Sequence, residues 1–319
     1  MKKYLLVIMI FMIGLTFISC NEQNQERDVF VTVYPLQYLV EELFKDTDLT
    51  VGMVPGISAH NEAIDWSPKE IIAMMNASLL IYVGANFDTY IDNQIGQIFA
   101  GKNVELVKVE NNLLDFIPGI VHDHDDDHSD LSMRQLSTLG YDPHFWVSPK
   151  RMLTLAEGIL ELLKNKFPDE SAVFDVNYET LSGNLGILDM FFEQVIGLAD
   201  KHVMTSTNLY SYLAYDYGLE FIPISPGYHE ETDQFTTQQK EEIVQEAIYH
   251  NIVHIIYERD SSSPLSNAVF SSLTGLGYNM TKLEFVIMDT LTKSDIDFNN
   301  DYMKIMYANL EVIRIATGQ

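Results

Sequence analysis

The chain has 319 residues, with 46 acidic side chains against 19 basic ones and a formal net charge of −27. A protein this acidic repels nucleic acids and anionic lipid surfaces, and it draws cations toward any acidic cleft. Its length is sufficient for two compact domains.

The N-terminus reads "MKKYLLVIMIFMIGLTFISC". Two lysines precede an apolar run that is too short and wrongly flanked for a membrane span, so residues 1–19 are predicted to be a lipoprotein signal peptide. Cys20 is the only cysteine, which excludes an intramolecular disulfide. We expect Cys20 to be lipidated and to begin a polar tether over 20–27. The alternative is an uncleaved anchor with an incidental cysteine. Either way, we expect an exported, membrane-anchored protein on the extracytoplasmic side, in the periplasm or at the cell surface.

The first half of the chain alternates short apolar runs, predicted to be strands, with amphipathic segments, predicted to be helices. Ser67 and Ser148 each stand directly before a proline and are expected to cap helices. The predicted strands span 28–35, 49–55, 78–84 and 104–109, and the predicted helices span 36–44, 67–76, 87–100 and 148–167.

From Pro168 to about Ala199 the sequence has helical periodicity with little turn chemistry, and we predict one long helix despite two glycines. The alternation then resumes. The predicted strands span 202–206, 219–225, 252–258 and 282–288, and the predicted helices span 209–218, 237–250, 264–275 and about 300–316.

This order predicts an α/β fold of two similar lobes, each a parallel sheet flanked by helices, joined by one long rigid helix. The expected boundaries are an N-terminal lobe over 28–167, a linking helix over 168–200 and a C-terminal lobe over 201–319. Both lobes are expected to bind the metal discussed below.

Ligands of open parallel sheets bind at the loops beyond the carboxyl ends of the strands. Three polar residues are expected in such loops: His60 in "PGISAHNEAIDWSP", His144 in "YDPHFWVSP" and Asp289 in "VIMDTL". Imidazole nitrogens together with a carboxylate suit Zn²⁺ or Mn²⁺. On these features alone, a histidine in such a loop is more often an ordinary loop residue than a metal ligand.

Three longer stretches carry a resemblance: "VPGISAHNEAIDWSPKEIIAMMNASLLIYVGANFD", "DPHFWVSPKRM" and "YLAYDYGL". They resemble the metal-specific solute-binding lipoproteins of ABC transporters, the zinc- and manganese-uptake group that includes ZnuA and TroA. The resemblance covers essentially the whole chain after the signal. It implies one metal ion between the lobes, held by His60, His144 and Asp289.

One position departs from this family. Five residues before Tyr212 the family has a histidine or sometimes a glutamate, and here Thr207 stands there. A neutral hydroxyl is a weak zinc ligand, so Thr207 is only a possible fourth position. A water could complete the sphere, affinity could have fallen, or another side chain could take part, with His229 and Glu230 as candidates.

The most conspicuous cluster is "VHDHDDDHSD", with His122, His124 and His128 in a predicted loop. Zinc-type members of the family often carry such a loop. A mobile run of imidazoles and carboxylates binds metal weakly because it is not preorganised. We therefore expect an accessory metal loop, with a solvated acidic loop of no function as the alternative.

Two further histidines are separated by four residues, His250 and His254, and would share a face if both were helical. Asn251 is expected to end the helix, so we predict that the pair diverges. His202 begins a predicted strand and is expected to be structural.

No G-x-S-x-G, Walker A or H-E-x-x-H motif is present, so we predict no enzyme. The resemblance implies a monomeric receptor that delivers Zn²⁺, or alternatively Mn²⁺, to an ABC transporter permease and its ATPase. Two rival interpretations are a zinc-dependent hydrolase with an open coordination position, and a metal-free adhesin-like paralogue.

Overall fold

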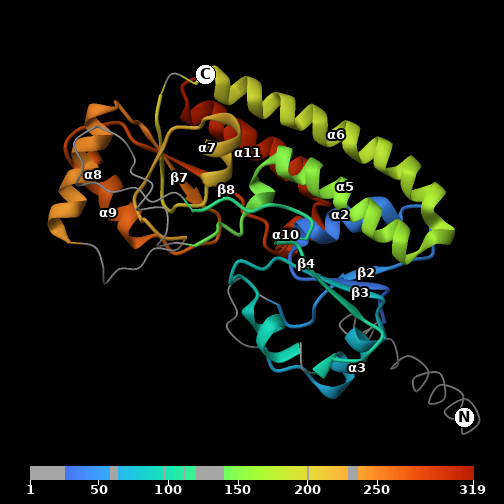
Figure 1. Ribbon diagram of the computed structural model, residues 1–319. Coiled ribbons are helices and arrows are strands. Elements are labelled where there is room, and N and C mark those ends of the chain that lie inside the picture. Colours follow the sequence, from blue (N-terminus) through green and yellow to red (C-terminus); the bar gives the residue numbers. More distant parts are fainter. Residues whose placement is uncertain are drawn as a thin grey trace, which may run out of the picture.

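The computed structural model describes residues 26–57, 64–95, 98–110, 112–119, 140–199, 201–228 and 236–319. These residues form two four-stranded, all-parallel sheets, with strand orders β2-β1-β3-β4 and β6-β5-β7-β8. The two sheets therefore repeat one topology, which confirms the predicted fold class (Figure 1).

The N-terminal lobe contains the first sheet and its helices. Its elements are β1 (Val29–Val31), α2 (Tyr34–Phe44), β2 (Val51–Met53), α3 (Pro68–Asn76), β3 (Leu79–Tyr82), the π-helix η2 (Ile91–Ile95), β4 (Glu105–Lys108), the short 3₁₀ helix η4 (Phe145–Val147) and α5 (Pro149–Lys166).

The short 3₁₀ helix η5 (Pro168–Glu170) and the long helix α6 (Ser171–Gly197) lead to the C-terminal lobe. The elements of that lobe are β5 (Val203–Thr205), α7 (Ser211–Tyr217), β6 (Phe221–Pro223), α8 (Thr237–Tyr249), β7 (His254–Glu258), α9 (Pro264–Gly275), β8 (Thr281–Phe285), α10 (Lys293–Asp297) and α11 (Tyr302–Ala316).

Local chemistry explains several of these boundaries. Ser67 and Ser148 cap α3 and α5 as predicted, each accepting a hydrogen bond from a backbone N–H of the first turn. Gly218 ends α7 with φ of +80°, a conformation that glycine adopts without strain. The long helix continues through Gly183 and Gly186, and a Cβ added at either position would meet nothing within 4 Å.

The predicted helix over 87–100 is confirmed in part. A left-handed turn occupies Gly84 to Asn86, with φ between +50° and +93°. Residues 89–90 and 98 are α-helical and the π-helix η2 lies between them, so the described part of this segment is helical but irregular. The carboxylate of Asp88 holds this turn by accepting hydrogen bonds from the backbone N–H groups of Val83 and Gly84 at 2.7 and 2.9 Å. These contacts keep Asp88 outside a regular helix.

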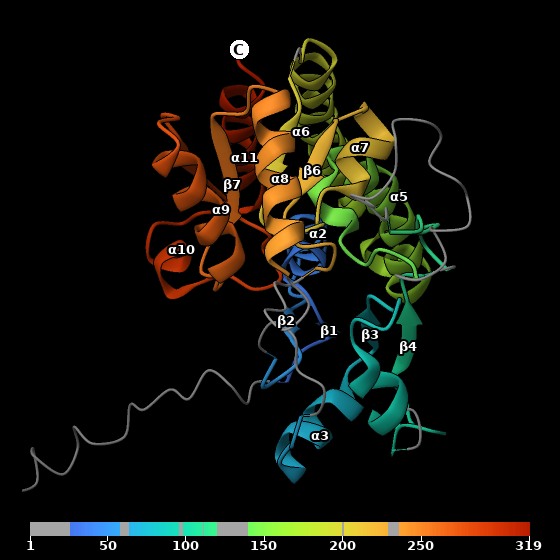
Figure 2. The same cartoon turned by 90° about the vertical axis from the view of Figure 1, so that its left-hand side faces the viewer.

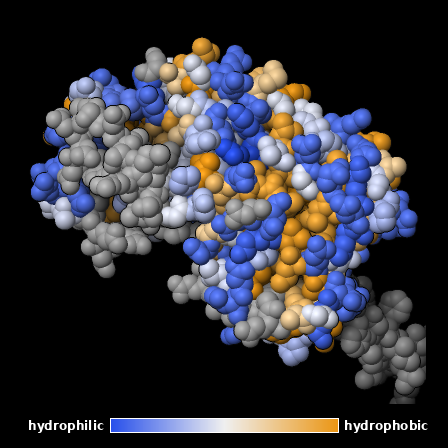
Figure 3. Space-filling view, viewed as in Figure 1, coloured by the Kyte–Doolittle hydropathy of each residue, from blue (hydrophilic) through white to orange (hydrophobic). Residues whose placement is uncertain are grey.

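The two lobes share one hydrophobic core. It runs from α2 and α5 through α6 to α11, whereas each sheet has a smaller separate cluster on its other face. Figures 1 and 2 both show α6 lying along α5, α2 and α11, and these helices are in contact. In the view of Figure 3, hydrophobic side chains show through in a band below α6, between hydrophilic margins. The long helix is thus part of a core that joins the lobes.

No helix of the described residues is both long enough and apolar enough to cross a membrane. The predicted signal peptide and Cys20 lie outside the described residues.

Candidate metal centre

A cavity of about 480 Å³ lies where the two lobes meet, and it contains three of the predicted residues. His144 enters it from the N-terminal lobe, and Thr207 and Asp289 line it from the C-terminal lobe. Its remaining lining comes from Leu209, Tyr228, Glu258, Arg259, Asp260, Ser261, Ser262, Val286, Ile287, Met288, Thr290 and Thr292.

The topology explains why the cavity is here. In the C-terminal sheet β5 is paired with β6 on one side and β7 on the other, so the chain reverses its direction of winding between β5 and β7. Such a switch point leaves a crevice at the carboxyl ends of the two strands. Thr207 follows β5 by two residues and Glu258 ends β7, so both stand at this crevice.

His144 is prepared to bind an electrophile. Its side chain is 2% exposed, and its backbone N–H and ring Nδ1 both lie 2.9 Å from Oδ1 of Asp142. Because a carboxylate accepts and does not donate, Nδ1 carries the hydrogen and Nε2 keeps its lone pair. Nε2 is buried and has no hydrogen-bond partner among the described residues. Histidine ligands of metals commonly have such an outer carboxylate.

Aromatic rings fix the His144 imidazole from three sides. The centroids of Tyr228, Trp146 and Phe87 lie 5.0, 5.4 and 5.9 Å from that of the imidazole, all edge-to-face. The backbone just before His144 is held as well, because the Tyr212 hydroxyl donates a hydrogen bond to the Asp142 carbonyl at 2.9 Å. The imidazole is therefore held in place before any ligand arrives.

Two hydrogen bonds join the His144 segment and α2 to the loop that carries Asp289. Trp146 Nε1 donates to the carbonyl of Ile287 at 2.6 Å, and the Tyr34 backbone N–H donates to the carbonyl of Asp289 at 2.8 Å. Met288 between them has φ of +68°, which turns the chain at this point. These two bonds hold the N-terminal and C-terminal lobes together beside the cavity.

Asp289 supplies the negative charge. Its side chain is 8% exposed, and burial raises the pKa of the carboxyl group, an effect that a charge on His144 opposes. A carboxylate without solvent is stabilised by a cation. The pair His144 and Asp289 therefore favours a cation between the lobes.

Thr207 and Glu258 complete the wall at the switch point. Thr207 is 3% exposed, and its Oγ1 has no hydrogen-bond partner among the described residues. Glu258 accepts hydrogen bonds from the hydroxyls of Ser206 and Tyr210. Burial raises the pKa of Glu258, while Ser206 and the nearby Thr207 hydroxyl lower it, although Thr207 lacks the geometry of a full hydrogen bond.

The other predicted site residues cannot be placed relative to this cavity, because they are not among the residues that the structure describes. His60, the loop histidines His122, His124 and His128, and the pair His229 and Glu230 lie outside the described residues. Across the described ranges, no group of three His, Cys, Asp or Glu side chains is arranged to hold a metal. Within those ranges, His144 and Asp289 alone do not make up such a group.

The remaining histidines sit elsewhere. His250 follows the last residue of α8 and His254 begins β7, so the two do not share a helix face, as predicted. His202 pairs with Glu220 at 3.0 Å, and its ring stacks on that of His250 at 3.9 Å. These contacts account for His202 as a structural residue.

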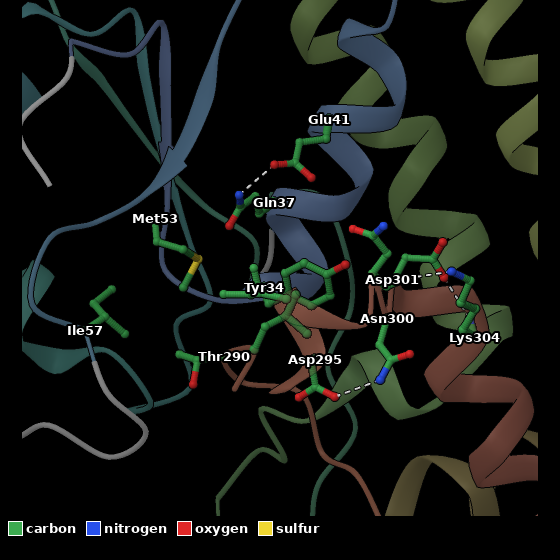
Figure 4. Close-up of a pocket in the computed structure, with 13 residues that line it drawn as sticks. Tyr34, Gln37, Glu41, Met53, Ile57, Thr290, Asp295, Asn300, Asp301 and Lys304 are labelled. Atoms are coloured by element: carbon green, nitrogen blue, oxygen red, sulfur yellow. Dashed lines mark hydrogen bonds between the residues drawn. The ribbon is translucent and has the colours of Figure 1, made fainter. Parts of the chain in front are cut away.

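A second cavity, of about 680 Å³, lies beside the first and shares Thr290 with it (Figure 4). Its carboxylates are engaged. Burial alone would raise the pKa of Asp295, but hydrogen bonds from Thr292 and Arg259 hold it at about 2. Asp301 caps α11 by accepting from the Lys304 backbone N–H at 2.8 Å, and Glu41 accepts from Gln37 at 2.6 Å. These three carboxylates of the second cavity therefore already have hydrogen-bond partners in the described protein.

Sequence reasoning missed three residues: Tyr228 and Glu258, which line the first cavity, and Asp142, which contacts His144. Glu258 could have been found, because it ends a predicted strand in the way that Asp289 follows one. Asp142 stands two residues before His144, but nothing in the pattern shows that its side chain turns back to the ring. Tyr228 is placed only by the tertiary fold.

A cavity lined by an imidazole and a carboxylate lies between two lobes, each built on a parallel sheet, and this arrangement suits the binding of a cation. The family model described as "Zinc-uptake complex component A periplasmic" matches residues 29–316. The chain belongs to this family, which confirms the predicted resemblance.

Individual relatives agree. The zinc-binding lipoprotein AdcA of Streptococcus pneumoniae TIGR4 is 24% identical over all of this chain, which spans 62% of the length of AdcA. The high-affinity zinc uptake system protein ZnuA of Bacillus subtilis strain 168 is 23% identical, over 93% of this chain and 89% of that protein. These relatives are zinc-binding and zinc-uptake proteins rather than enzymes, so the prediction that the chain is not an enzyme is confirmed.

Solved structures share the fold. The Zn(II)-bound ZnuA-like domain of S. pneumoniae AdcA superposes with a TM-score of 0.69 at 22% identity, over 92% of this chain and 100% of that one. The periplasmic zinc-binding protein TroA of Treponema pallidum gives a TM-score of 0.70 at 15% identity, over 92% and 100%. At these identities the likeness establishes the two-lobed architecture.

Proposed function

We propose that this protein is an extracytoplasmic receptor, lipid-anchored through Cys20, that captures Zn²⁺ between its lobes and delivers it to an ABC transporter permease. Mn²⁺ is the less favoured cargo. His60, His144 and Asp289 are the proposed protein ligands. The zinc-named relatives support the metal, and the family model supports a role in uptake.

One observation carries the proposal: the buried Nε2 of His144 has no partner in the described protein and lies in the same cavity as the carboxylate of Asp289. A buried polar atom without a partner indicates a missing ion or water. A neutral imidazole provides a directional bond to Zn²⁺, and a carboxylate lowers the net charge of the complex. A permease then needs to recognise only the closed, loaded arrangement of the lobes.

The test is a competitive zinc titration of the chain from residue 21. We expect one zinc per chain with a dissociation constant near nanomolar, or about −12 kcal/mol. His144→Ala and Asp289→Ala should each weaken binding by more than about 100-fold, because losing an outer partner of a ligand alone costs about 10- to 100-fold.

Two controls sharpen this experiment. His202→Ala removes a histidine that pairs with Glu220 away from the cavity, and its affinity should equal that of the wild type. A variant lacking residues 122–130 should also keep tight binding. If instead tight binding disappears with that loop and survives His144→Ala, the metal centre is the acidic loop and the proposal is wrong.

A further inference from the structure

Three residues that line the cavity each have a buried polar atom without a hydrogen-bond partner among the described residues. The atoms are Nε2 of His144, Oγ1 of Thr207 and the hydroxyl oxygen of Tyr228. Orphaned polar atoms are rare in folded proteins, and three in one cavity indicate an ion or water that they share.

The Tyr228 hydroxyl is placed to act as a donor. Its ring lies 5.0 Å from that of His144 at an interplanar angle of 66°, so both rings line the same side of the cavity. A tyrosine phenol is protonated at neutral pH, and a neutral phenol is a better hydrogen-bond donor than a metal ligand.

Thr207 is placed to act as an acceptor. Its side chain stands just beyond the carboxyl end of β5, in the lining of the same cavity as Tyr228. Its oxygen has no hydrogen-bond partner among the described residues, so its lone pairs can accept a hydrogen bond there. A neutral threonine oxygen is a poor ligand for Zn²⁺, which prefers imidazole, thiolate and carboxylate.

We propose that Tyr228 and Thr207 hold a water molecule on the bound cation, in the position where the family has a histidine. The water receives a hydrogen bond from the phenol, donates one to the threonine oxygen and gives a lone pair to the cation. This supplies the two to four polar partners that a buried water needs. The inference rests on the proposed cation binding, and it makes Tyr228 a residue that determines affinity and ligand type at that site.

The first test detects the water directly. The wild-type chain is loaded with Co²⁺, and its electron paramagnetic resonance spectrum is compared in ordinary and ¹⁷O-enriched water. We expect ¹⁷O broadening in the wild type and none in Thr207→His, whose imidazole displaces the water. The cavity of about 480 Å³ has room for that side chain. An unbroadened spectrum of Co²⁺-loaded wild type would overturn the inference.

The second test measures what the hydroxyls contribute. Tyr228→Phe and Thr207→Val each remove one hydrogen bond at nearly constant volume, and each should weaken zinc binding about two- to tenfold. Because both bonds serve the same water, their effects should not add, and the double variant should resemble the weaker-binding single variant. Tyr249→Phe is the matched control, since that ring is 70% exposed at the end of α8 and should leave affinity unchanged.

The outcomes separate this inference from the proposed function. If the wild type binds neither Zn²⁺ nor Co²⁺, the cation receptor itself is refuted, and the water falls with it. If the wild type binds both metals tightly but shows no ¹⁷O broadening, or if Tyr228→Phe and Thr207→Val keep wild-type affinity, the receptor stands and the water does not.

Discussion

Replacing Asp142 by asparagine isolates the contact that prepares His144. Oδ1 of Asp142 accepts from both the backbone N–H and Nδ1 of His144 at 2.9 Å, and the residue is fully buried. An amide oxygen can keep both hydrogen bonds, but it removes the negative charge that makes the imidazole a stronger electron donor. We therefore expect the geometry to survive and the zinc affinity to fall.

The expected loss is about 10- to 100-fold in the dissociation constant, equivalent to about 1.4–2.8 kcal/mol. Folding should suffer as well. Oδ2 of Asp142 has no partner among the described residues, so the new amide N–H₂ would be buried beside no acceptor. An unsatisfied buried donor costs about 1–3 kcal/mol of unfolding free energy.

The assay measures two quantities on each variant: the zinc dissociation constant by competition, and the unfolding free energy of the metal-free protein in urea. Asp216→Asn is the matched control. Asp216 has a buried carboxylate that accepts hydrogen bonds from Ser148 and Arg151, two residues that follow His144 closely in the sequence. None of its hydrogen bonds within the described residues goes to the imidazole of His144. It should lose at least as much stability and no zinc affinity. If Asp142→Asn binds zinc within twofold of the wild type, the argument about Nδ1 is wrong.

Three other consequences can be measured. Zinc affinity should decrease below about pH 6, because the ligands must be deprotonated to bind the metal. The pKa of Asp289 is raised, so protonation of its carboxyl group should add to this loss. Equal zinc dissociation constants at pH 5 and 7 would exclude these ligands. Burial raises the pKa of Asp88 from 3.8 to about 6. The contribution of Asp88 to the unfolding free energy of the metal-free protein should therefore be complete below pH 3.8 and be lost, by about 3 kcal/mol, as pH rises through 6. Urea unfolding at several pH values should show this loss in the wild type and not in Asp88→Asn. Trp146→Phe removes the bond to the Ile287 carbonyl and core volume, and should reduce the unfolding free energy by about 1–3 kcal/mol; an unchanged midpoint in urea would show that this bond does not hold the lobes together.

Much of the fold follows from short-range patterns. The serine and proline pairs at Ser67 and Ser148 mark helix starts, and the structure places α3 and α5 there. The helical periodicity after Pro168 continues through two glycines, and the structure has the long helix α6 there. Parallel sheets follow from the strand–helix alternation, since each crossover helix returns the chain to the end of the sheet at which the previous strand began.

Long-range placement is where sequence reasoning stops. The helix predicted over 87–100 begins only at residue 89, because the Asp88 carboxylate accepts hydrogen bonds from the backbone N–H groups of Val83 and Gly84 and holds a turn before it. For the same reason the His144–Asp142 contact was not predicted. The pattern shows which residues end strands, and only the packed lobes show that Thr207 and Tyr228 meet His144 in one cavity.

The most direct test of the central claim is the position of the metal itself. Crystals of the zinc-loaded chain would be measured at the zinc absorption edge, and an anomalous difference map would locate the ion. The account predicts one strong peak between the lobes, about 2 Å from Nε2 of His144 and from the carboxylate of Asp289. A peak bound elsewhere, with none at His144, would contradict it.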